Sequence, residues 1–380
     1  MKSGRKVLFL ASWYPSDENL TLGNFVQKHA ELANEVANVD VLYAVNSNAV
    51  KQITIVDKIV NSLRTVIVYY PSIRSKVPLI RSLVKKQSYL RALEKGFEHL
   101  DTSYDLVHLN AVFPAGIFAK WLKQKYKIPY IATVHWTGFL EHHNVFDSLP
   151  FYLKQTFKKI FKEANQVLPV SDHLGRSLTK LRLIKEFTVL NNVVKSTSFY
   201  PAKERTGDIS NNRFLHISTF DDEHKNISGM LSAFSRLKTD FYLHIVTEGE
   251  ELDVWKAIEN HNIPKGQCIV QSKLNTVQIG QAMRQADCLV LFSNYETFSV
   301  VLAEAWMSGL PAIYSQCGGL TEINNPDLGM QIKLRDESGL LNALESFTIN
   351  DYNPELICDF ANQFSEEGIK RQLEEVYRSF

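Results

Sequence analysis

The fold is decided by the stretch Asp287-Cys-Leu-Val-Leu-Phe-Ser-Asn-Tyr-Glu-Thr-Phe-Ser-Val-Val-Leu-Ala-Glu-Ala-Trp-Met-Ser-Gly-Leu-Pro311. The short apolar run at 287–293 is typical of a buried parallel strand. Residues 300–307 are apolar almost all round, and Gly309 and Pro311 follow as stop signals, so this segment predicts a buried helix. Because an apolar run at 312–314 then begins another strand, the stretch predicts a strand–helix–strand unit of a parallel sheet.

Two carboxylates in this stretch do not fit a simple core. Glu304 lies within the apolar helix, where an unpaired charge costs several kcal/mol, so we expect it to have a partner. Glu296 lies where the strand ends and the helix begins, and ligands of open α/β sheets bind at that edge. The first N–H groups of the helix are also suited to a phosphate. This edge is therefore the predicted binding site.

The same alternation of strand and helix extends over the whole chain. Before residue 195 it predicts strands at 6–12, 39–44, 65–70, 105–110, 129–135, 166–171 and 187–193. After a polar linker at 195–212 it predicts strands at 214–218, 241–246, 268–271, 287–293 and 312–314. Two doubly wound α/β domains account for 380 residues, and we place them at 1–197 and 198–365, with an amphipathic helix at 366–380.

Composition narrows the class of protein. Hydrophobic residues make up 45% of the chain and charged residues 22%, as in soluble globular proteins, and no apolar run approaches the ~18 residues of a membrane span. The run 7–11 is too short for the core of a signal peptide. The four cysteines lack metal-site spacing, and His142-His143 has no third ligand nearby, so we expect reduced cytoplasmic thiols and no metal site.

The net charge of +1 conceals an uneven distribution. Residues 1–195 carry 27 Lys and Arg against 15 Asp and Glu, a net charge of +12, while the rest carries 15 against 26, a net charge of −11. This asymmetry suggests different partners for the two halves. The chain has neither a G-x-G-x-x-G nor a G-x-x-x-x-G-K motif, which disfavours a dinucleotide-binding or P-loop enzyme.

The spacing Glu296-x7-Glu304, between a strand and an apolar helix, resembles the E-x7-E signature of retaining glycosyltransferases of family 4. The downstream Cys317-Gly-Gly-Leu-Thr-Glu322 resembles the Gly-Gly-x-x-Glu loop of that family. The resemblance implies the GT-B fold, in which two Rossmann-like domains face each other across a cleft and the last helix, here 366–380, packs back on the first domain. It also implies a nucleoside-diphosphate sugar as donor substrate, no cofactor and no metal.

The resemblance assigns the donor-side roles in the second domain. Glu304 is expected to accept hydrogen bonds from ribose hydroxyls, and Glu296 to contact the transferred sugar. Lys225 matches the lysine of the family's Gly-Arg…Lys-Gly phosphate loop, but Thr219 stands where the family has arginine. The alternative interpretation is that Lys225 is an ordinary solvated residue at the start of a helix. The remaining donor-side candidates are Thr297, Phe298, Ser299, Val300 and Gly249.

In the first domain, His135 follows a predicted strand and resembles the active-site histidine of the family, which contacts the donor sugar. A single histidine is also a common structural hydrogen-bonding group, and that alternative remains open. Asn110 and Gly23 lie at equivalent strand ends and are further candidates. We take His135, Glu296 and Lys225 as the catalytic candidates.

The expected function is transfer of a sugar from a nucleoside-diphosphate sugar to a glycan or lipid-linked acceptor in surface polysaccharide or glycolipid assembly. Alternatives are a non-catalytic nucleotide-sugar binding protein and another GT-B enzyme, such as a sugar-nucleotide epimerase. Basic segments with interleaved apolar residues indicate either peripheral contact with an anionic membrane or a solvated face, and no nucleic-acid partner is expected. These basic residues are Arg74, Lys76, Arg81, Lys85, Lys86, Arg91, Lys95, Lys154, Lys158, Lys159 and Lys162.

Overall fold

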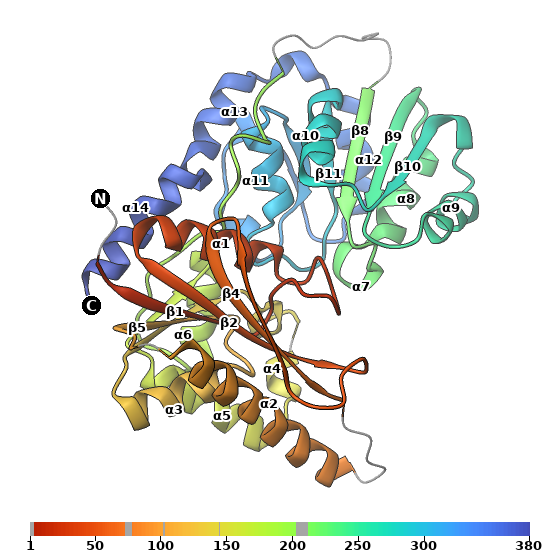
Figure 1. Ribbon diagram of the computed structural model, residues 1–380. Helices are drawn as coiled ribbons and strands as arrows, with labels where there is room; N and C mark the ends of the chain where they lie inside the picture. Colours follow the sequence, from red (N-terminus) through yellow and green to blue (C-terminus); the bar gives the residue numbers. More distant parts are fainter. Residues whose placement is uncertain (1–3, 73–77, 102, 144, 203–211) are drawn as a thin grey trace. The chain divides into compact units, whose positions relative to one another are not determined.

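The structure is a computed structural model that describes residues 4–72, 78–101, 103–143, 145–202 and 212–380 of the chain (Figure 1). Contacts divide the chain into two compact units, and the second lies within the sequence of the first. Unit 1 comprises residues 1–192 and 369–380, and unit 2 comprises residues 193–368. The division falls at 192/193, a few residues before the expected boundary at 197/198.

Unit 1 contains a seven-stranded sheet in the order β3-β4-β2-β1-β5-β6-β7, in which the β3–β4 pair is antiparallel and the other pairs are parallel. The inner strands are buried along most of their length, as expected of strands covered by helices on both faces. The strands are β1 (Lys6–Ala11), β2 (Asn38–Ser47), β3 (Thr54–Val60), β4 (Leu63–Pro71), β5 (Leu106–Asn110), β6 (Tyr130–Val134) and β7 (Gln166–Pro169).

Helices cover both faces of this sheet. Figure 1 shows α2, α3 and α5 on one face and α1 on the other, as right-handed crossovers in a doubly wound sheet require. The helices of unit 1 are α1 (Asn24–Val36), α2 (Pro78–Leu100), α3 (Gly116–Tyr126), α4 (Val145–Ser148), α5 (Phe151–Glu163) and α6 (Asp172–Lys180).

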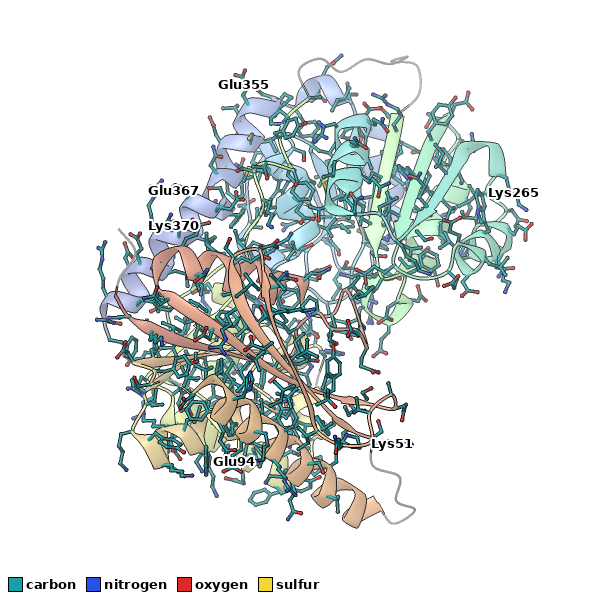
Figure 2. The ribbon with its side chains drawn as sticks, in the orientation of Figure 1. Lys51, Glu94, Lys265, Glu355, Glu367 and Lys370 are labelled. Atoms are coloured by element: carbon teal, nitrogen blue, oxygen red, sulfur yellow. The ribbon has the colours of Figure 1, made fainter. Side chains whose placement is uncertain are left out.

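The C-terminal helix α14 (Glu366–Arg378) belongs to unit 1 from residue 369 onward. Its buried face consists of Ile369, Leu373, Val376 and Tyr377, the residues that the sequence pattern predicts. Tyr377 hydrogen-bonds Nδ1 of His108 in β5 through its hydroxyl group at 2.7 Å. Lys370, labelled in Figure 2, approaches Glu35 of α1 with 3.0 Å between its Nζ and a carboxylate oxygen. These contacts attach the end of the chain to the first sheet.

Unit 2 contains a parallel six-stranded sheet in the order β10-β9-β8-β11-β12-β13. Its strands are β8 (Asn212–Ser218), β9 (Phe241–Thr247), β10 (Cys268–Ser272), β11 (Cys288–Leu291), β12 (Ala312–Ser315) and β13 (Gly329–Ile332). Helices α8, α9 and α12 lie on one face, and α10, α11 and α13 on the other. The helices are α7 (Asp222–Lys225), α8 (Ile227–Arg236), α9 (Glu251–Asn260), α10 (Thr276–Gln285), α11 (Val300–Met307), α12 (Glu337–Ser346) and α13 (Pro354–Ala361).

Two doubly wound parallel-sheet units confirm the expected fold class, but the sequence reading misses β3 and β13 and wrongly makes 187–193 a strand. That segment donates two backbone hydrogen bonds to β7, from Thr188 N to Val167 O and from Leu190 N to Pro169 O. Pro169 has no N–H to return a bond, so a complete ladder does not form there. None of the described helices has the length and hydropathy of a membrane span.

Candidate functional site

Each unit places its candidate residues beside the point where the order of its strands reverses. In unit 1 the chain moves outward from β1 in one direction and returns to continue in the other direction from β5. In unit 2 the same reversal separates β8 from β11. Open α/β sheets bind ligands outside the carboxyl ends of the strands at these reversals. Glu296 follows β11, Lys225 follows β8, Asn110 ends β5 and His135 follows β6.

The center of the unit 2 site is an ion pair between Lys225 and Glu296. The Nζ atom of Lys225 lies 2.6 Å from Oε1 of Glu296, and the hydroxyl group of Ser293 donates to the same oxygen at 2.9 Å. The carboxylate is nearly buried, with 9% of its side chain exposed, whereas the lysine side chain is 22% exposed. The pair thus holds an ammonium group at the surface of the site while its buried partner is satisfied.

Backbone contacts hold the two loops that carry this pair. The N–H of Asn294 donates to the carbonyl of His224 at 2.8 Å, and the side-chain amide of Asn294 donates to the carbonyl of Glu223 at 2.9 Å. From the other side, the N–H of Gly319 donates to the carbonyl of Glu296 at 3.0 Å. The Gly-Gly loop that the sequence singles out therefore supports Glu296 directly.

The start of α11 lies beside Glu296. Ser299 adopts a left-handed conformation with a φ of 63°, and its side chain makes no capping hydrogen bond within the described part of the chain. The first N–H groups of a helix lack intrahelical acceptors, so the N–H groups near Val300 are of the type that binds an anion. The ring of Phe298 packs against Phe364 at 5.1 Å, which leaves its backbone as the group that a ligand could use. Thr297, which precedes it, is half-buried.

Glu304 lies on α11 and is only 7% exposed, as its place in the apolar helix predicts. Thr219 follows β8 and is exposed. Gly249 follows β9, where a Cβ atom at this position would lie 4.0 Å from the carbonyl oxygen of Thr219, so these two candidates are neighbours. The structure therefore gathers Lys225 with Glu296, and Thr219 with Gly249, at one edge of the sheet.

Two other basic residues do not fill the position of the family arginine. Arg213 lies at the start of β8, the opposite end of the strand, and forms an ion pair with Asp287 at 2.8 Å. Lys273 follows β10 at the carboxyl edge, but its ammonium group pairs with Glu250 at 3.1 Å and both side chains are exposed.

In unit 1, His135 and Asn110 meet at the ends of neighbouring strands. The Nε2 atom of His135 lies 3.3 Å from Oδ1 of Asn110, and both residues are buried. With Asn110 as acceptor, the ring proton is on Nε2 and Nδ1 is an acceptor. Among the described residues, Nδ1 of His135 and the amide nitrogen of Asn110 have no hydrogen-bond partner. Buried polar groups normally have one, so these two atoms keep an unused capacity for hydrogen bonding.

Gly23 belongs to the same cluster. It precedes α1 with a φ of 74°, and a Cβ atom there would lie 2.7 Å from the backbone of Trp13. This close approach brings the start of α1 to the site, where the ring of Phe25 lies 4.8 Å from that of His135. Gly23, Asn110 and His135, which are far apart in sequence, thus lie together.

Burial keeps His29, His108 and His135 of unit 1 neutral in the folded protein. The pKa of His135 lies well below its ordinary value because of burial and, to a lesser extent, the nearby His29 and His108. Burial also lowers the pKa of His29 to about 4 and that of His108 to about 3. A neutral imidazole can accept or donate a hydrogen bond but supplies no charge. His135 is therefore suited to hydrogen bonding with a hydroxyl group rather than to stabilising an anion.

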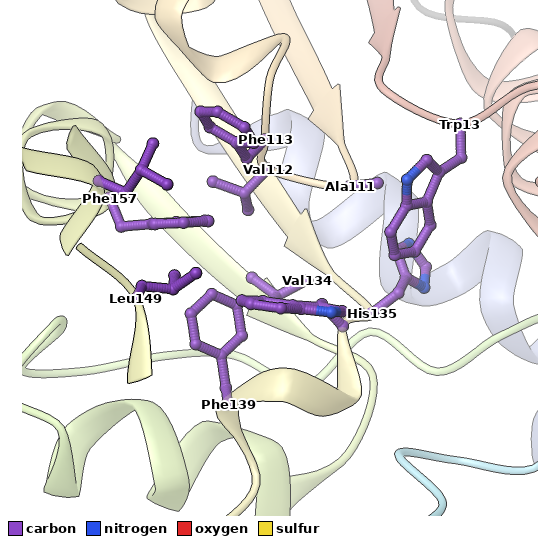
Figure 3. A pocket seen from close by; sticks show the side chains of 11 residues that line it. Trp13, Ala111, Val112, Phe113, Val134, His135, Phe139, Leu149 and Phe157 are labelled. Atoms are coloured by element: carbon purple, nitrogen blue, oxygen red, sulfur yellow. The ribbon is translucent and has the colours of Figure 1, made fainter. Parts of the chain in front are cut away.

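A cavity of about 260 Å³ opens beside His135 (Figure 3). His135 and Trp13 lie at one end of it, and Leu149 and Phe157 lie toward the other. The lining is almost entirely apolar and consists of Trp13, Ala111, Val112, Phe113, Val134, His135, Trp136, Phe139, Leu149, Leu153 and Phe157. Sequence reasoning misses this aromatic group and also Ser293, although aromatic residues after several strand ends were a usable signal.

Within the described residues, no group of three or more His, Cys, Asp or Glu side chains could hold a metal ion. All four cysteines are free thiols. The groups that the two sites offer to a ligand include the Lys225–Glu296 pair, the N–H groups at the start of α11 and the neutral imidazole of His135.

Comparison with known protein families adds two matches. Residues 31–197 match the model described as Glycosyltransferase Family 4, and residues 204–371 match the model described as Glycosyl transferases group 1. Together the two models span nearly the whole chain.

The chain is also similar to individual proteins, in sequence or in fold. The chain is 27% identical over 236 residues to glycogen synthase of Mycobacterium tuberculosis. The aligned region includes 59% of this chain and 56% of that protein, so the chain spans about half the length of this relative. Its fold is similar to that of sucrose-phosphate synthase from Thermosynechococcus elongatus, with a TM-score of 0.75, 17% identity and 99% of both chains covered. It is also similar to Anabaena HepE in complex with UDP and glucose, with a TM-score of 0.71, 16% identity and coverage of 99% and 100%.

Proposed function

Because the chain belongs to glycosyltransferase family 4 through both of its halves and has a GT-B fold, we propose that it is a retaining, metal-independent glycosyltransferase. The donor is a nucleoside-diphosphate sugar, bound by unit 2, and no cofactor takes part. The acceptor is a glycan or a lipid-linked sugar of a surface polysaccharide or glycolipid. HepE, whose fold is similar, was solved with UDP and glucose bound, which supports a nucleotide sugar as the donor.

The Lys225–Glu296 ion pair carries this proposal. A sugar nucleotide needs a cation for its diphosphate and acceptors for its sugar hydroxyls at neighbouring positions. The 2.6 Å pair supplies both at the carboxyl edge of the sheet, beside the first turn of α11. A lysine held by a carboxylate is positioned before the ligand arrives, so less reorganisation accompanies binding.

The remaining donor contacts follow from the same edge. The N–H groups at the start of α11, from Thr297 to Val300, point their partial positive charge toward a phosphate. The carboxylate of Glu304 accepts hydrogen bonds from two ribose hydroxyls at once. Gly249 allows close approach of the base, since a ligand there meets backbone rather than a side chain.

In the proposed reaction, the bond between the anomeric carbon and the diphosphate breaks as a bond to an acceptor oxygen forms on the same face of the sugar. The proton of the acceptor hydroxyl passes to the leaving phosphate, and Lys225 stabilises the charge that develops on that group. His135, neutral in the folded protein, hydrogen-bonds a hydroxyl of the transferred sugar.

We place the protein in the cytoplasm, at the inner face of a membrane that carries the acceptor. The four free cysteines support the first part. The second part rests on the positive charge of unit 1 and on the exposed side chains of Lys85, Lys86 and Arg91 in α2. Arg74 and Lys76 of the predicted basic run lie outside the described residues.

The proposal is tested first by a thermal-shift panel of nucleotide sugars, because a ligand that binds the folded state raises the apparent stability. The donor that stabilises the protein is then incubated with and without acceptors, and the anomeric configuration of the product is read by NMR. A transferred sugar with retained configuration supports the proposal. Isomerised nucleotide sugar without acceptor indicates an epimerase, and binding without turnover across acceptors indicates a binding protein.

A further inference from the structure

The cavity of unit 1 is a chemically unusual site for an enzyme that handles sugars. Of its eleven lining side chains, only His135, Trp13 and Trp136 carry a hydrogen-bonding group. A buried hydroxyl group without a partner costs about 1–3 kcal/mol, and a hexose carries several hydroxyls. The lining therefore disfavours a whole sugar ring and favours a hydrocarbon group.

The walls of the cavity are held in place before any ligand binds. The ring of Trp136 stacks on Phe157 at 5.9 Å and meets Phe139 edge-on at 4.9 Å, while Phe113 lies 5.3 Å from Phe157. Trp136 lies directly over Gly138, where a Cβ atom would come within 2.3 Å of the indole ring. A glycine is therefore required for this position of Trp136. Such packing makes the cavity a formed site rather than a chance gap.

The cavity is open and large enough for part of a chain. Trp13, Phe113, Trp136, Leu149 and Leu153 are each only half-buried, so apolar lining reaches the surface. An apolar cavity of about 150 Å³ already binds benzene, and this one measures about 260 Å³.

The surface of α5 continues the apolar lining outward. Leu153 and Phe157, one helical turn apart, line the cavity, while the preceding Phe151 and Tyr152 are 76% and 61% exposed. Exposed aromatic side chains beside a cavity extend the apolar surface past its opening. Farther along α5, Lys158, Lys159 and Lys162 are exposed and would face the phosphate groups of a lipid carrier or a membrane.

We propose that this cavity binds the hydrocarbon part of the acceptor, so that the acceptor is a lipid-linked sugar or an alkyl glycoside rather than a free glycan. The proposal rests on the proposed function, since it names the acceptor of that reaction. The hydrocarbon lies along the apolar walls toward Leu149 and Phe157, and the polar end of the acceptor stays near His135 at the other end of the cavity.

The first experiment measures binding without a donor. A series of n-alkyl glucosides from methyl to octyl, each below its micelle concentration, is titrated into the protein and followed by tryptophan fluorescence. Each added methylene is expected to tighten binding about fourfold, the equivalent of about 0.8 kcal/mol, until the cavity is filled. An octyl glucoside that binds no more tightly than methyl glucoside would overturn the proposal.

Matched variants distinguish the cavity from general detergent binding. Leu153→Gln places an amide in the half-buried wall and is expected to weaken octyl glucoside binding at least tenfold, with methyl glucoside unaffected. Leu252→Gln makes the same change at an exposed leucine of α9 in unit 2 and should bind the octyl compound much as the wild type does. Gly138→Ala, which displaces Trp136 from the wall of the cavity, should also weaken octyl glucoside binding. Equal effects of Leu153→Gln and Leu252→Gln would contradict a specific site.

The second experiment separates this inference from the proposed function. The acceptor found in the product screen is prepared with a methyl and with an octyl aglycone, and KM and kcat are measured with the donor that binds. The octyl form should have the lower KM, and Leu153→Gln should remove that advantage without lowering kcat. Equal KM values with normal transfer overturn the hydrocarbon site and leave the function standing. No transfer to any acceptor, with octyl binding intact, instead overturns the function and with it the assignment of the hydrocarbon to an acceptor.

Discussion

The two units use one fold to build two different sites. Each is a doubly wound sheet with its candidate residues at the reversal of strand order, between β1 and β5 in unit 1 and between β8 and β11 in unit 2. In unit 2 the edge carries an ion pair, Lys225 with Glu296, and the start of a helix. In unit 1 the corresponding edge carries a neutral histidine and an apolar cavity.

The two units thus share the edge at which open α/β sheets bind ligands, but the side chains at that edge differ in charge and polarity. A diphosphate needs fixed positive charge, which unit 2 supplies, whereas an apolar group gains from the removal of water, which unit 1 allows.

Removal of Lys225 should have the largest effect. If Lys225 stabilises the leaving diphosphate, Lys225→Ala should lower kcat about 10²–10³-fold, the usual loss when one preorganised electrostatic group is removed. Lys273→Ala, a change to an exposed lysine at the same edge of the sheet, serves as control and should retain most of the activity. Because Lys225→Ala leaves the buried Glu296 without its partner, the double variant with Glu296→Gln checks that the loss does not arise from unfolding. Unchanged kcat in folded Lys225→Ala would place the phosphate elsewhere.

Acid should destabilise unit 1 more steeply than unit 2. Burial lowers the pKa values of His29, His108, His135 and His173 in unit 1. In unit 2 it lowers the pKa of His216 to about 4 and also lowers that of His244. Each is neutral when folded, so its contribution is complete above pH ~6.5 and is lost as the pH falls, because the unfolded chain then binds the proton. Every such proton adds a slope of about 1.4 kcal/mol per pH unit.

This contrast is measured by hydrogen exchange of peptides from β5 and β6 and from β8 and β11 at pH 7.5 and 5.5, corrected for intrinsic rates. The peptides of unit 1 should lose more protection, and His108→Gln should reduce the difference. Equal losses in the two units would contradict the account.

Glu304→Ala should weaken nucleotide binding while the protein stays folded. Loss of a charged hydrogen-bond acceptor costs about 1.5–3 kcal/mol, or roughly ten- to hundredfold in affinity. Glu322→Ala, a change to an exposed glutamate of the Gly-Gly loop, is the matched control. Calorimetry with the nucleoside diphosphate decides, and equal affinities of Glu304→Ala and wild type would remove the ribose role of this residue.

The smallest effect concerns the membrane. Unit 1 should bind vesicles that contain anionic lipid and be released by high salt, and Lys159→Gln should weaken binding about fivefold, since one lysine near such a surface contributes about 1 kcal/mol. Co-sedimentation with anionic and neutral vesicles measures this. If binding does not depend on anionic lipid, the basic residues are only a solvated face.

The sequence predicts the regular parts of this molecule because their signals are local. The amphipathic helix α14 follows from apolar periodicity, and the candidate site at Glu296 follows from its place after a buried strand. The Lys225–Glu296 contact was not foreseen, although both residues were singled out, because the parallel pairing of β8 with β11 joins segments separated by 71 positions.

The cavity of unit 1 lay beyond sequence reasoning for a related reason. Trp13, Phe113, Trp136 and Phe157 come from separate loops and one helix, and each reads locally as an ordinary core or surface aromatic residue. Likewise, residues 187–193 have the apolar pattern of a strand, but Pro169 of the neighbouring strand cannot complete the ladder. Both the cavity and the conformation of residues 187–193 depend on contacts between segments that are distant in the sequence.

We propose a division of labour in which unit 2 holds the donor diphosphate through Lys225 while unit 1 holds the apolar part of the acceptor. It is tested most directly by calorimetric titration of UDP, ADP and GDP into wild type, Lys225→Ala, Thr219→Arg and Leu153→Gln. For the nucleotide that binds, Lys225→Ala should bind at least tenfold more weakly, Thr219→Arg as tightly or more tightly, and Leu153→Gln as the wild type does. If Lys225→Ala binds like the wild type, or if Leu153→Gln loses nucleotide affinity, the division of labour between the units is wrong.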